Sequence, residues 1–203
     1  MKGCRALSEK EVMDVSETFA GEFALRDRAL FLLGTLSGFR ISELLSLRLA
    51  DVARDGKVFD QVTVARRNMK RKKEGRTVPL NPKAAAALAD WLHDLARHGL
   101  TAGEIFLFRS RKGDNRPITR QAAHAILKGA FQVNGLGGKT GTHSMRKSFA
   151  DRIYNKAVDL QRAGASVDPL TFCQKALGHR NINSTISYLS FREDLVNQAI
   201  LAL

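Results

Sequence analysis

An arginine and a glutamate three residues apart, Arg40 and Glu43, follow a glycine that interrupts a predicted helix. If a second short helix begins near Arg40, both side chains lie on the same face of that helix. One interpretation is a surface ion pair, which contributes under about 1 kcal/mol. The other is a guanidinium that the carboxylate fixes in place, so that it can grip a phosphate through two oxygen atoms.

A histidine and an arginine with the same spacing, His143 and Arg146, follow the glycine-rich stretch 135–141. We predict that they lie in the first turns of a helix, whose amino end favours an anion. One interpretation is structural, because a single histidine near the start of a helix usually has no role in binding or catalysis. The arginine one turn later favours a second interpretation, in which the pair binds an anion.

The chain has two tyrosines, and Tyr188 comes nine residues after His179 of the sequence Leu-Gly-His-Arg. The stretch around Tyr188 is rich in serine, threonine and asparagine, which is a polar setting for an aromatic ring. The other tyrosine, Tyr154, lies within a predicted helix and is expected to pack. Taken alone, the pattern favours a half-buried packing role for Tyr188 as well.

Basic residues dominate the segment 66–76, where seven of eleven residues are lysine or arginine and Glu74 is the only acid. We predict that this segment is the turn between two strands. A solvated hairpin tip is one interpretation. The other is contact with a phosphate backbone, which relieves the repulsion between like charges and releases counterions. The predicted contacts are Arg66, Arg67, Arg71, Lys72, Lys73 and Arg76.

The composition points to a polyanionic partner. The 203 residues include 33 lysines and arginines against 20 acidic residues, a net charge of +13. This charge indicates a nucleic acid first and an anionic membrane surface second. A hydrophobic fraction of 44% is sufficient for a core and excludes general disorder. We predict no targeting segment, membrane span or metal site, and the two distant cysteines suit the reducing cytoplasm.

Most of the chain is predicted to be helical, with one small antiparallel sheet, so the fold class is α+β, mostly α. A capping box at Ser8 begins the first helix, Gly38 ends the second, and Pro82 begins a later one. Pro79 restricts the second strand to an edge or an end. The predicted helices are 8–20, 26–37, 41–47, 81–98, 119–134, 143–157, 168–177, 181–189 and 191–202, and the predicted strands are 58–65 and 77–80.

In chain order, the motifs are Gly-x-Arg-x-x-Glu, the basic hairpin, His-x-x-Arg, Leu-Gly-His-Arg and the tyrosine. This series resembles that of the tyrosine recombinase, or phage integrase, family over about Leu7 to Tyr188. The resemblance implies the catalytic fold of that family. By motif match, it places the family's active-site roles on Arg40, Lys70, His143, Arg146, His179 and Tyr188, with Glu43 in support.

The resemblance implies transfer of a DNA strand through a covalent phosphotyrosine, without a metal, ATP or another cofactor. Tyr188 attacks a phosphodiester, giving a 3′-phosphotyrosyl link and a free 5′-hydroxyl, and the hydroxyl of a second strand then reseals the DNA. His143 is the implied base, and a lysine of the hairpin protonates the leaving oxygen. Lys70 fits best by counting back from the Arg-x-Val-Pro motif, and Lys72 and Lys73 are alternatives.

The resemblance also implies partners and a domain organisation. The expected partner is double-stranded DNA, bound by a homotetramer, with a monomer as the alternative when DNA is absent. We expect residues 1–203 to form a single catalytic domain without an N-terminal clamp domain. It is then either an isolated catalytic domain or a short stand-alone recombinase, like those that invert fimbrial switches. The stretch from Arg146 to Leu177 is longer than is usual in the family, with the excess around 156–168. The helix 191–202 either docks on a neighbouring protomer or packs within its own chain.

Two other functions stay open. A type IB topoisomerase uses the same chemistry to relax supercoils, and a DNA-binding regulator can keep the fold without catalysis. The presence of every motif argues against the regulator, since a DNA-binding protein needs no nucleophile.

Overall fold

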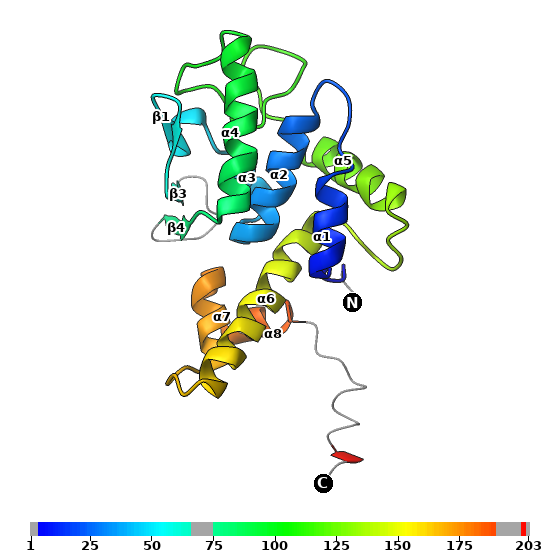
Figure 1. Cartoon of the computed structure of the whole chain (residues 1–203), viewed down its shortest axis with the longest axis vertical. Coiled ribbons are helices and arrows are strands. Elements are labelled where there is room, and N and C mark those ends of the chain that lie inside the picture. Colours follow the sequence, from blue (N-terminus) through cyan, green and yellow to red (C-terminus); the bar gives the residue numbers. More distant parts are fainter. Residues whose placement is uncertain (1–3, 66–74, 190–199, 202–203) are drawn as a thin grey trace. The chain divides into compact units, whose positions relative to one another are not determined.

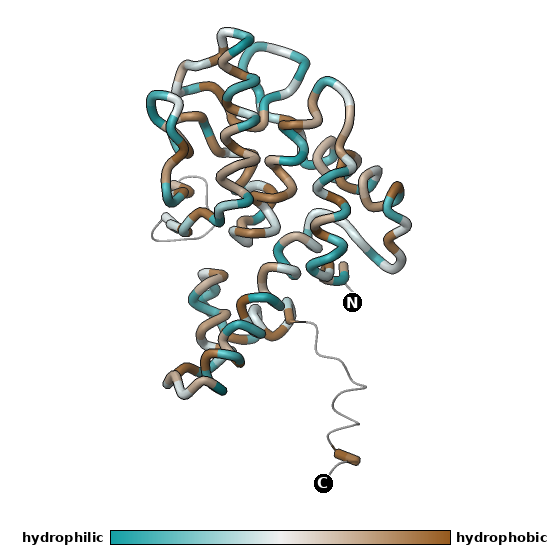
Figure 2. Tube along the Cα trace, in the orientation of Figure 1, coloured by the Kyte–Doolittle hydropathy of each residue, from teal (hydrophilic) through white to brown (hydrophobic). Residues whose placement is uncertain are grey.

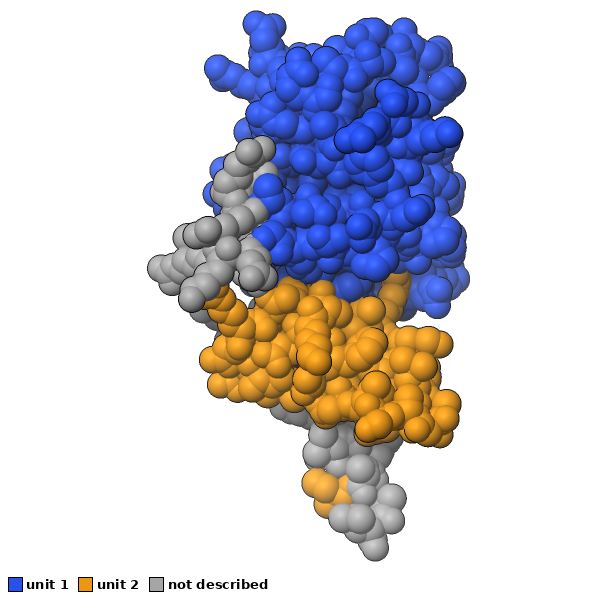
Figure 3. Space-filling model, turned by 90° about the vertical axis from the view of Figure 1, so that its left-hand side faces the viewer, with its two compact units in different colours: residues 1–149 blue, residues 150–203 orange. Residues whose placement is uncertain are grey.

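The computed structural model describes residues 4–65, 75–189 and 200–201 of the chain. The chain divides into two compact units, residues 1–149 and 150–203, coloured blue and orange in Figure 3. The boundary falls within the long helix α6 (Thr142–Arg162). Helices predominate in both units, and the described strands all lie in the first unit, which confirms the predicted α+β, mostly α class.

Helix α2 (Ala24–Ser37) is the centre of the first unit. Its residues from Ala29 to Thr35 are buried on every side of the helix. A helix buried all round needs cover from several elements. Helices α1 (Glu9–Ser16) and α4 (Pro82–Arg97) contact it, as Figure 1 shows. From α5 (Arg120–Val133), the ring of Phe131 meets Phe31 edge-on, with 6.2 Å between ring centroids.

Helix α4 is amphipathic, with its buried apolar residues along one face. Figure 2 shows hydrophobic and hydrophilic residues interspersed along it. Asn81 caps the helix by accepting a hydrogen bond from the backbone amide of Lys83, and Pro82 is the first helical residue, as predicted. The buried residues of α4 are Ala84, Ala87, Leu88, Trp91 and Leu95.

Local signals place most helix ends correctly. Both hydrogen bonds of the capping box at Ser8 are present, and Gly38 ends α2 in the left-handed conformation. Three helices are shorter than predicted: α1 ends at Ser16 rather than near residue 20, α3 covers only Ile41–Leu44, and α8 covers only Ile182–Ile186. Just beyond α1, Phe19 packs on Phe31 with ring centroids 5.8 Å apart, so a tertiary contact takes the chain out of the helix there.

The structure confirms one predicted hairpin, but the first strand of that hairpin begins later than predicted. β3 (Gln61–Val64) and β4 (Arg76–Pro79) pair antiparallel, and Pro79 is the last residue of its strand, as predicted. The prediction of one strand over 58–65 is wrong, because β2 (Lys57–Val58) pairs instead with β1 (Ala53–Arg54) in a second two-stranded sheet. The turn between β1 and β2 is Asp-Gly with φ of 50° and 75°, which is the pattern of a type I′ hairpin.

The second unit contains most of α6 together with α7 (Pro169–Leu177) and α8 (Ile182–Ile186). Helix α6 continues five residues beyond the predicted end at 157, so the first part of the segment 156–168 is helical. Asp168 caps α7, and Gly178 ends it in the left-handed conformation. The predicted helix 191–202 lies outside the described residues except at 200–201, which are helical.

Candidate active site

The turn between α2 and α3 requires a glycine at position 38. Gly38 has a φ of 63°, which a residue with a side chain adopts only at a cost. A Cβ atom there would also collide with the ring of Phe149. The glycine therefore lets the chain turn sharply against α6 and leaves the carbonyl groups of Ser37 and Gly38 available as hydrogen-bond acceptors.

Arg40 and Glu43 form the predicted pair, and the structure shows how the pair is held. The Glu43 carboxylate accepts from the backbone amide of Arg40 at 2.8 Å and from its guanidinium Nη1 at 2.9 Å. The Glu43 side chain is 3% exposed, whereas that of Arg40 is 40% exposed. A buried carboxylate with two donors is unlike the solvated surface pair that the sequence left open. It fixes the guanidinium while leaving part of it accessible.

Arg146 lies next to this turn. It is only 2% exposed, and its guanidinium Nη1 donates a hydrogen bond to the carbonyl oxygen of Gly38. His143, three residues earlier on α6, is exposed. The fold therefore brings Arg40 and Arg146 to the same turn, although they are 106 positions apart in the sequence.

The start of α6, which presents His143 and Arg146, is fastened by the segment that precedes α1. The backbone amide of Arg5 donates to the carbonyl of Lys139, and its Nε donates to the carbonyl of Gly137, both at 2.8 Å. Two residues later, the amide of Leu7 donates to the hydroxyl of Ser148 at 2.7 Å. The Arg5 guanidinium also bonds Glu11, and this lowers the pKa of that carboxyl to about 2.

Arg76 is predicted to contact DNA, but the structure places it in the interior of the first unit. It is 9% exposed and donates hydrogen bonds to the carbonyls of Ser37 and Gly38. Arg76 therefore joins Arg40 and Arg146 at the turn, and we call these three residues the arginine group. The sequence analysis did not predict this position for Arg76. The period of strand β4 contains the signal, because Arg76 and Val78 share one face and Val78 lies in the core.

The second unit holds the other two predicted residues, His179 and Tyr188, side by side. Their ring centroids are 5.2 Å apart, with an angle of 52° between the ring planes. The Nδ1 atom of His179 shares a hydrogen bond of 3.0 Å with the hydroxyl of Thr185, which is fully buried. His179 and Tyr188 are both half-buried. Thr185 was not among the predicted residues, and it orients the histidine ring.

The hairpin residues 66–74 lie outside the described part of the chain. The roles predicted for them therefore stay predictions. They are Lys70 as the acid, with Lys72 and Lys73 as alternatives, and the DNA contacts at Arg66, Arg67, Arg71, Lys72 and Lys73.

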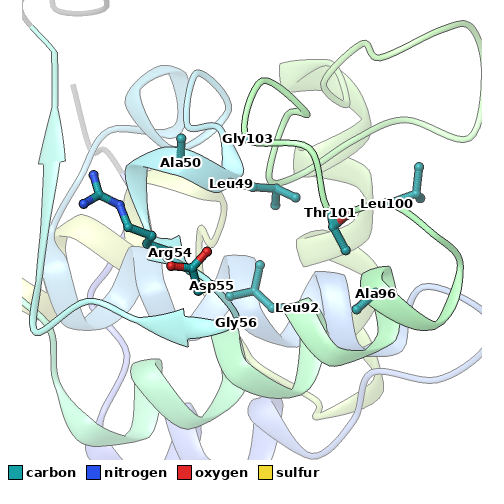
Figure 4. Close-up of a pocket in the computed structure, with 11 residues that line it drawn as sticks. Leu49, Ala50, Arg54, Asp55, Gly56, Leu92, Ala96, Leu100, Thr101 and Gly103 are labelled. Atoms are coloured by element: carbon teal, nitrogen blue, oxygen red, sulfur yellow. The ribbon is translucent and has the colours of Figure 1, made fainter.

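A hollow of about 300 Å³ lies elsewhere in the first unit, between the short helix η1 (Leu49–Asp51), the β1–β2 hairpin and α4 (Figure 4). Leu92 and Leu100 contribute apolar walls, and Arg54 and Asp55 contribute polar groups. None of the predicted site residues lines this hollow. The arginine group and the hollow are therefore separate features.

The residues that the structure describes contain neither a cluster suited to a metal ion nor a helix suited to a membrane. Within them, no three histidine, cysteine or acidic side chains gather in a way that could hold a metal ion. In the same parts of the chain, no helix has both the length and the apolar character that crossing a bilayer requires.

Comparison with known proteins identifies relatives over nearly the whole chain. The model of the phage integrase family matches residues 5–193. Tyrosine recombinase XerC of Herpetosiphon aurantiacus is 30% identical over 186 residues, covering 91% of this chain and 54% of that protein. The type 1 fimbriae regulatory protein FimB of Escherichia coli is 31% identical over 170 residues, covering 83% of this chain and 74% of FimB.

Solved structures with the same fold include two recombinases. The crystal structure of XerA recombinase matches 100% of this chain and 66% of its own, with a TM-score of 0.72 and 19% identity. The XerH site-specific recombinase bound to difH substrate, in a pre-cleavage complex, matches 98% of this chain and 55% of its own, with a TM-score of 0.69 and 22% identity. The chain spans about half the length of the XerC and XerD relatives that it matches.

Proposed function

Because the chain belongs to the phage integrase family and has the fold of the XerA and XerH recombinases, we propose that it cuts and rejoins double-stranded DNA at specific sites through a covalent link to Tyr188. One observation carries this proposal. Arg40 and Arg146 are held at one turn, by a buried carboxylate and by the Gly38 carbonyl respectively. Two fixed guanidiniums at one place suit a phosphate with two non-bridging oxygens.

In the proposed reaction, the Tyr188 phenol oxygen attacks the scissile phosphorus. The bond from phosphorus to the 5′-oxygen breaks, and a 3′-phosphotyrosyl link replaces it. His143 takes the phenol proton, and a hairpin lysine, Lys70 in our assignment, protonates the departing oxygen. The hydroxyl of an incoming strand then reverses these steps and releases the tyrosine. The energy of the phosphodiester is kept in the covalent link, so the two steps balance without ATP.

The proposed reaction develops negative charge on the phenol and on the phosphate, and the positive charges of the arginines stabilise it. A free phenol has a pKa of about 10, so its ionisation at pH 7 costs roughly 4 kcal/mol. The pentacovalent transition state also gathers negative charge on its non-bridging oxygens. Fixed donors for such charge contribute about 3–4 kcal/mol each. The proposal therefore assigns Arg40 and Arg146 to the phosphate oxygens, and Glu43 to the orientation of Arg40.

His179 is assigned to the phosphate or to the orientation of the nucleophile. Its Nδ1 is engaged with the Thr185 hydroxyl, which sets the plane of the ring. Its ring lies against that of Tyr188. A histidine fixed in this way can steady the tyrosine or donate to a phosphate oxygen from its second nitrogen.

The partners follow from the same proposal. XerH is bound to difH substrate, and a lambda integrase dimer is bound to a COC′ core site. We assign double-stranded DNA to this chain as well, with a homotetramer on the DNA, and we place the protein in the cytoplasm with its substrate. The net charge of +13 supports a polyanionic partner.

The test is covalent capture on nicked DNA. The 203-residue chain is incubated with a pool of duplexes of randomised sequence that carry one nick, and protein–DNA adducts are isolated in detergent and sequenced. We expect adducts at one sequence with the natural protein and none with Tyr188→Phe. Tyr154→Phe makes the same chemical change at the other tyrosine and should leave adduct formation intact. Adducts without sequence preference would instead indicate a topoisomerase, and the absence of adducts would indicate a DNA-binding regulator.

A further inference from the structure

Arg76 is the third arginine of the group at the turn, and its side chain is directed inward. It is the first residue of β4, a strand whose residues alternate between buried and exposed. Its neighbour on the same face, Val78, belongs to the hydrophobic core. Strand geometry therefore takes the Arg76 side chain into the first unit, although its charge resembles that of the preceding hairpin residues.

The Arg76 guanidinium contacts three consecutive residues of the turn that leads into Arg40. Its Nη2 donates to the carbonyl of Ser37 at 2.8 Å, and its Nη1 donates to the carbonyl of Gly38 at 3.3 Å. Its Cζ lies 5.0 Å from the centroid of the Phe39 ring. A rigid planar fork can satisfy two adjacent carbonyls at once, which a lysine amine cannot do with the same geometry.

The Gly38 carbonyl connects Arg76 to the predicted catalytic residues. It accepts from Arg76 and also from Arg146, as the two lone pairs of a carbonyl oxygen allow. Arg40 follows two residues later in the same turn. Loss of Arg76 would leave the Ser37 carbonyl without this donor and free the turn that both guanidiniums depend on.

The charges of the group add a second argument. Burial lowers the pKa of Arg76 below its ordinary value, the nearby charges of Arg146 and Arg40 lower it further, and Glu43 raises it. Like charges are thus held close together at some electrostatic cost. A phosphate held by Arg146 and Arg40 relieves this repulsion.

We propose that Arg76 is a positioning residue of the active site, which holds the Ser37–Gly38 carbonyls so that Arg146 and Arg40 meet the phosphate in a fixed arrangement. This inference rests on the proposed function. It replaces the role of a direct DNA contact that the sequence suggested for Arg76.

The first test compares cleavage with binding in Arg76→Met, which keeps an unbranched apolar stem and removes the guanidinium with its donors and its charge. We expect the single-turnover rate of adduct formation to fall on the order of 10²-fold, as for loss of a fixed donor. Duplex affinity should stay within about twofold of the natural value and its salt slope should not change, because a buried side chain contributes no phosphate contact of its own. Arg76→Lys should recover part of the rate, and added guanidinium should raise the rate of Arg76→Ala.

Arg48→Met is the matched control. Arg48 also donates to a backbone carbonyl, that of Glu104 at 2.7 Å, and lies over a phenylalanine ring, that of Phe106 at 4.7 Å. It belongs to none of the contacts at the turn, so its loss should leave the cleavage rate unchanged. Natural cleavage by Arg76→Met would overturn the proposal. A salt slope that falls by about one in Arg76→Met would also overturn it, since that result marks a phosphate contact.

A double-mutant cycle separates positioning from general damage to the fold. If Arg76 acts through Arg146, then Arg76→Met should cost little, under about threefold, in an Arg146→Met background. Full additivity of the two losses would contradict the proposal. Thermal melting of each variant shows whether the first unit remains folded.

A final measurement does not depend on DNA cleavage. In protein labelled with ¹⁵N-arginine, the Nε–H signal of Arg146 is identified by its loss in Arg146→Lys. We expect inorganic phosphate to shift this signal in the natural protein, and the shift to be lost in Arg76→Met but kept in Arg48→Met. If the natural protein forms no adduct while this pattern holds, the proposed function fails and the role of Arg76 stands. An unchanged response in Arg76→Met overturns that role.

Discussion

Substitution of Gly38 by alanine tests the turn on which the arginine group depends. A φ of 63° costs a residue with a Cβ about 1–2 kcal/mol. The new Cβ would also meet the ring of Phe149, and overpacking of this kind costs about 1–3 kcal/mol. We therefore expect Gly38→Ala to lower the free energy of unfolding of the first unit by about 2–5 kcal/mol, measured by urea denaturation.

Gly99→Ala separates the two contributions. Gly99 has a similar φ of 72°, but no atom lies within 4 Å of the position that its Cβ would take. It should therefore show the backbone cost alone. The difference between the two variants measures the crowding by Phe149, and Gly38→Ala should recover part of its loss when combined with Phe149→Leu. Equal losses in Gly38→Ala and Gly99→Ala would refute the close approach of α6 to the turn.

The same substitution has a consequence for catalysis. The Gly38 carbonyl accepts hydrogen bonds from both Arg76 and Arg146, so a shift of the turn disturbs two guanidiniums together. In conditions where Gly38→Ala is still folded, adduct formation should be slower by on the order of 10²-fold, while Gly99→Ala keeps the natural rate. A folded Gly38→Ala protein with natural cleavage would separate the turn from the chemistry.

Three further predictions concern single contacts. Glu43→Gln keeps the shape of the side chain but weakens its hold on Arg40, so single-turnover cleavage should fall about tenfold with duplex affinity unchanged. Thr185→Val removes the hydroxyl that orients His179 and should slow adduct formation by a similar factor, with the helical circular dichroism signal retained. The bond from Arg5 lowers the folded-state pKa of Glu11 to about 2 from an ordinary 4.5. Its contribution, about 1 kcal/mol after solvent screening, is therefore present above pH 4.5 and lost as the pH falls towards 2, and Glu11→Gln should remove this acid-dependent part from urea midpoints.

Local chemistry made much of the fold predictable. The capping box at Ser8, the left-handed glycine after α2 and the Asn81-Pro82 start of α4 are signals that act within a few residues, and all three are confirmed. The β1–β2 hairpin could also have been predicted, because Asp-Gly is the preferred pair for a type I′ turn. The end of α1 could not, since it depends on a contact between aromatic rings 12 positions apart.

The candidate site was likewise predictable from the sequence in part. The structure brings Arg40, Glu43 and Arg146, which the motifs selected, to one turn, and their catalytic roles stay predictions. The position of Arg76 was missed because charge density suggested one continuous basic surface. The two-residue period of β4 contradicts that interpretation, and here the burial of Val78 decides which face Arg76 takes.

In the proposed reaction, the burial of Arg146 and Arg76 means that the cost of ordering these side chains is met during folding. Removing a guanidinium from water is unfavourable unless its donors are satisfied, and here backbone carbonyls of one tight turn accept from both. Those carbonyls are fixed by the helix that ends at Gly38 and by the positioning residue Arg76, so folding of the first unit sets the guanidinium of Arg146 before any substrate arrives. Donors fixed in advance need no reorganisation as charge develops on the phosphate, and this is the condition under which they stabilise a transition state most. A mobile arginine on the surface would have to lose side-chain entropy at that moment instead.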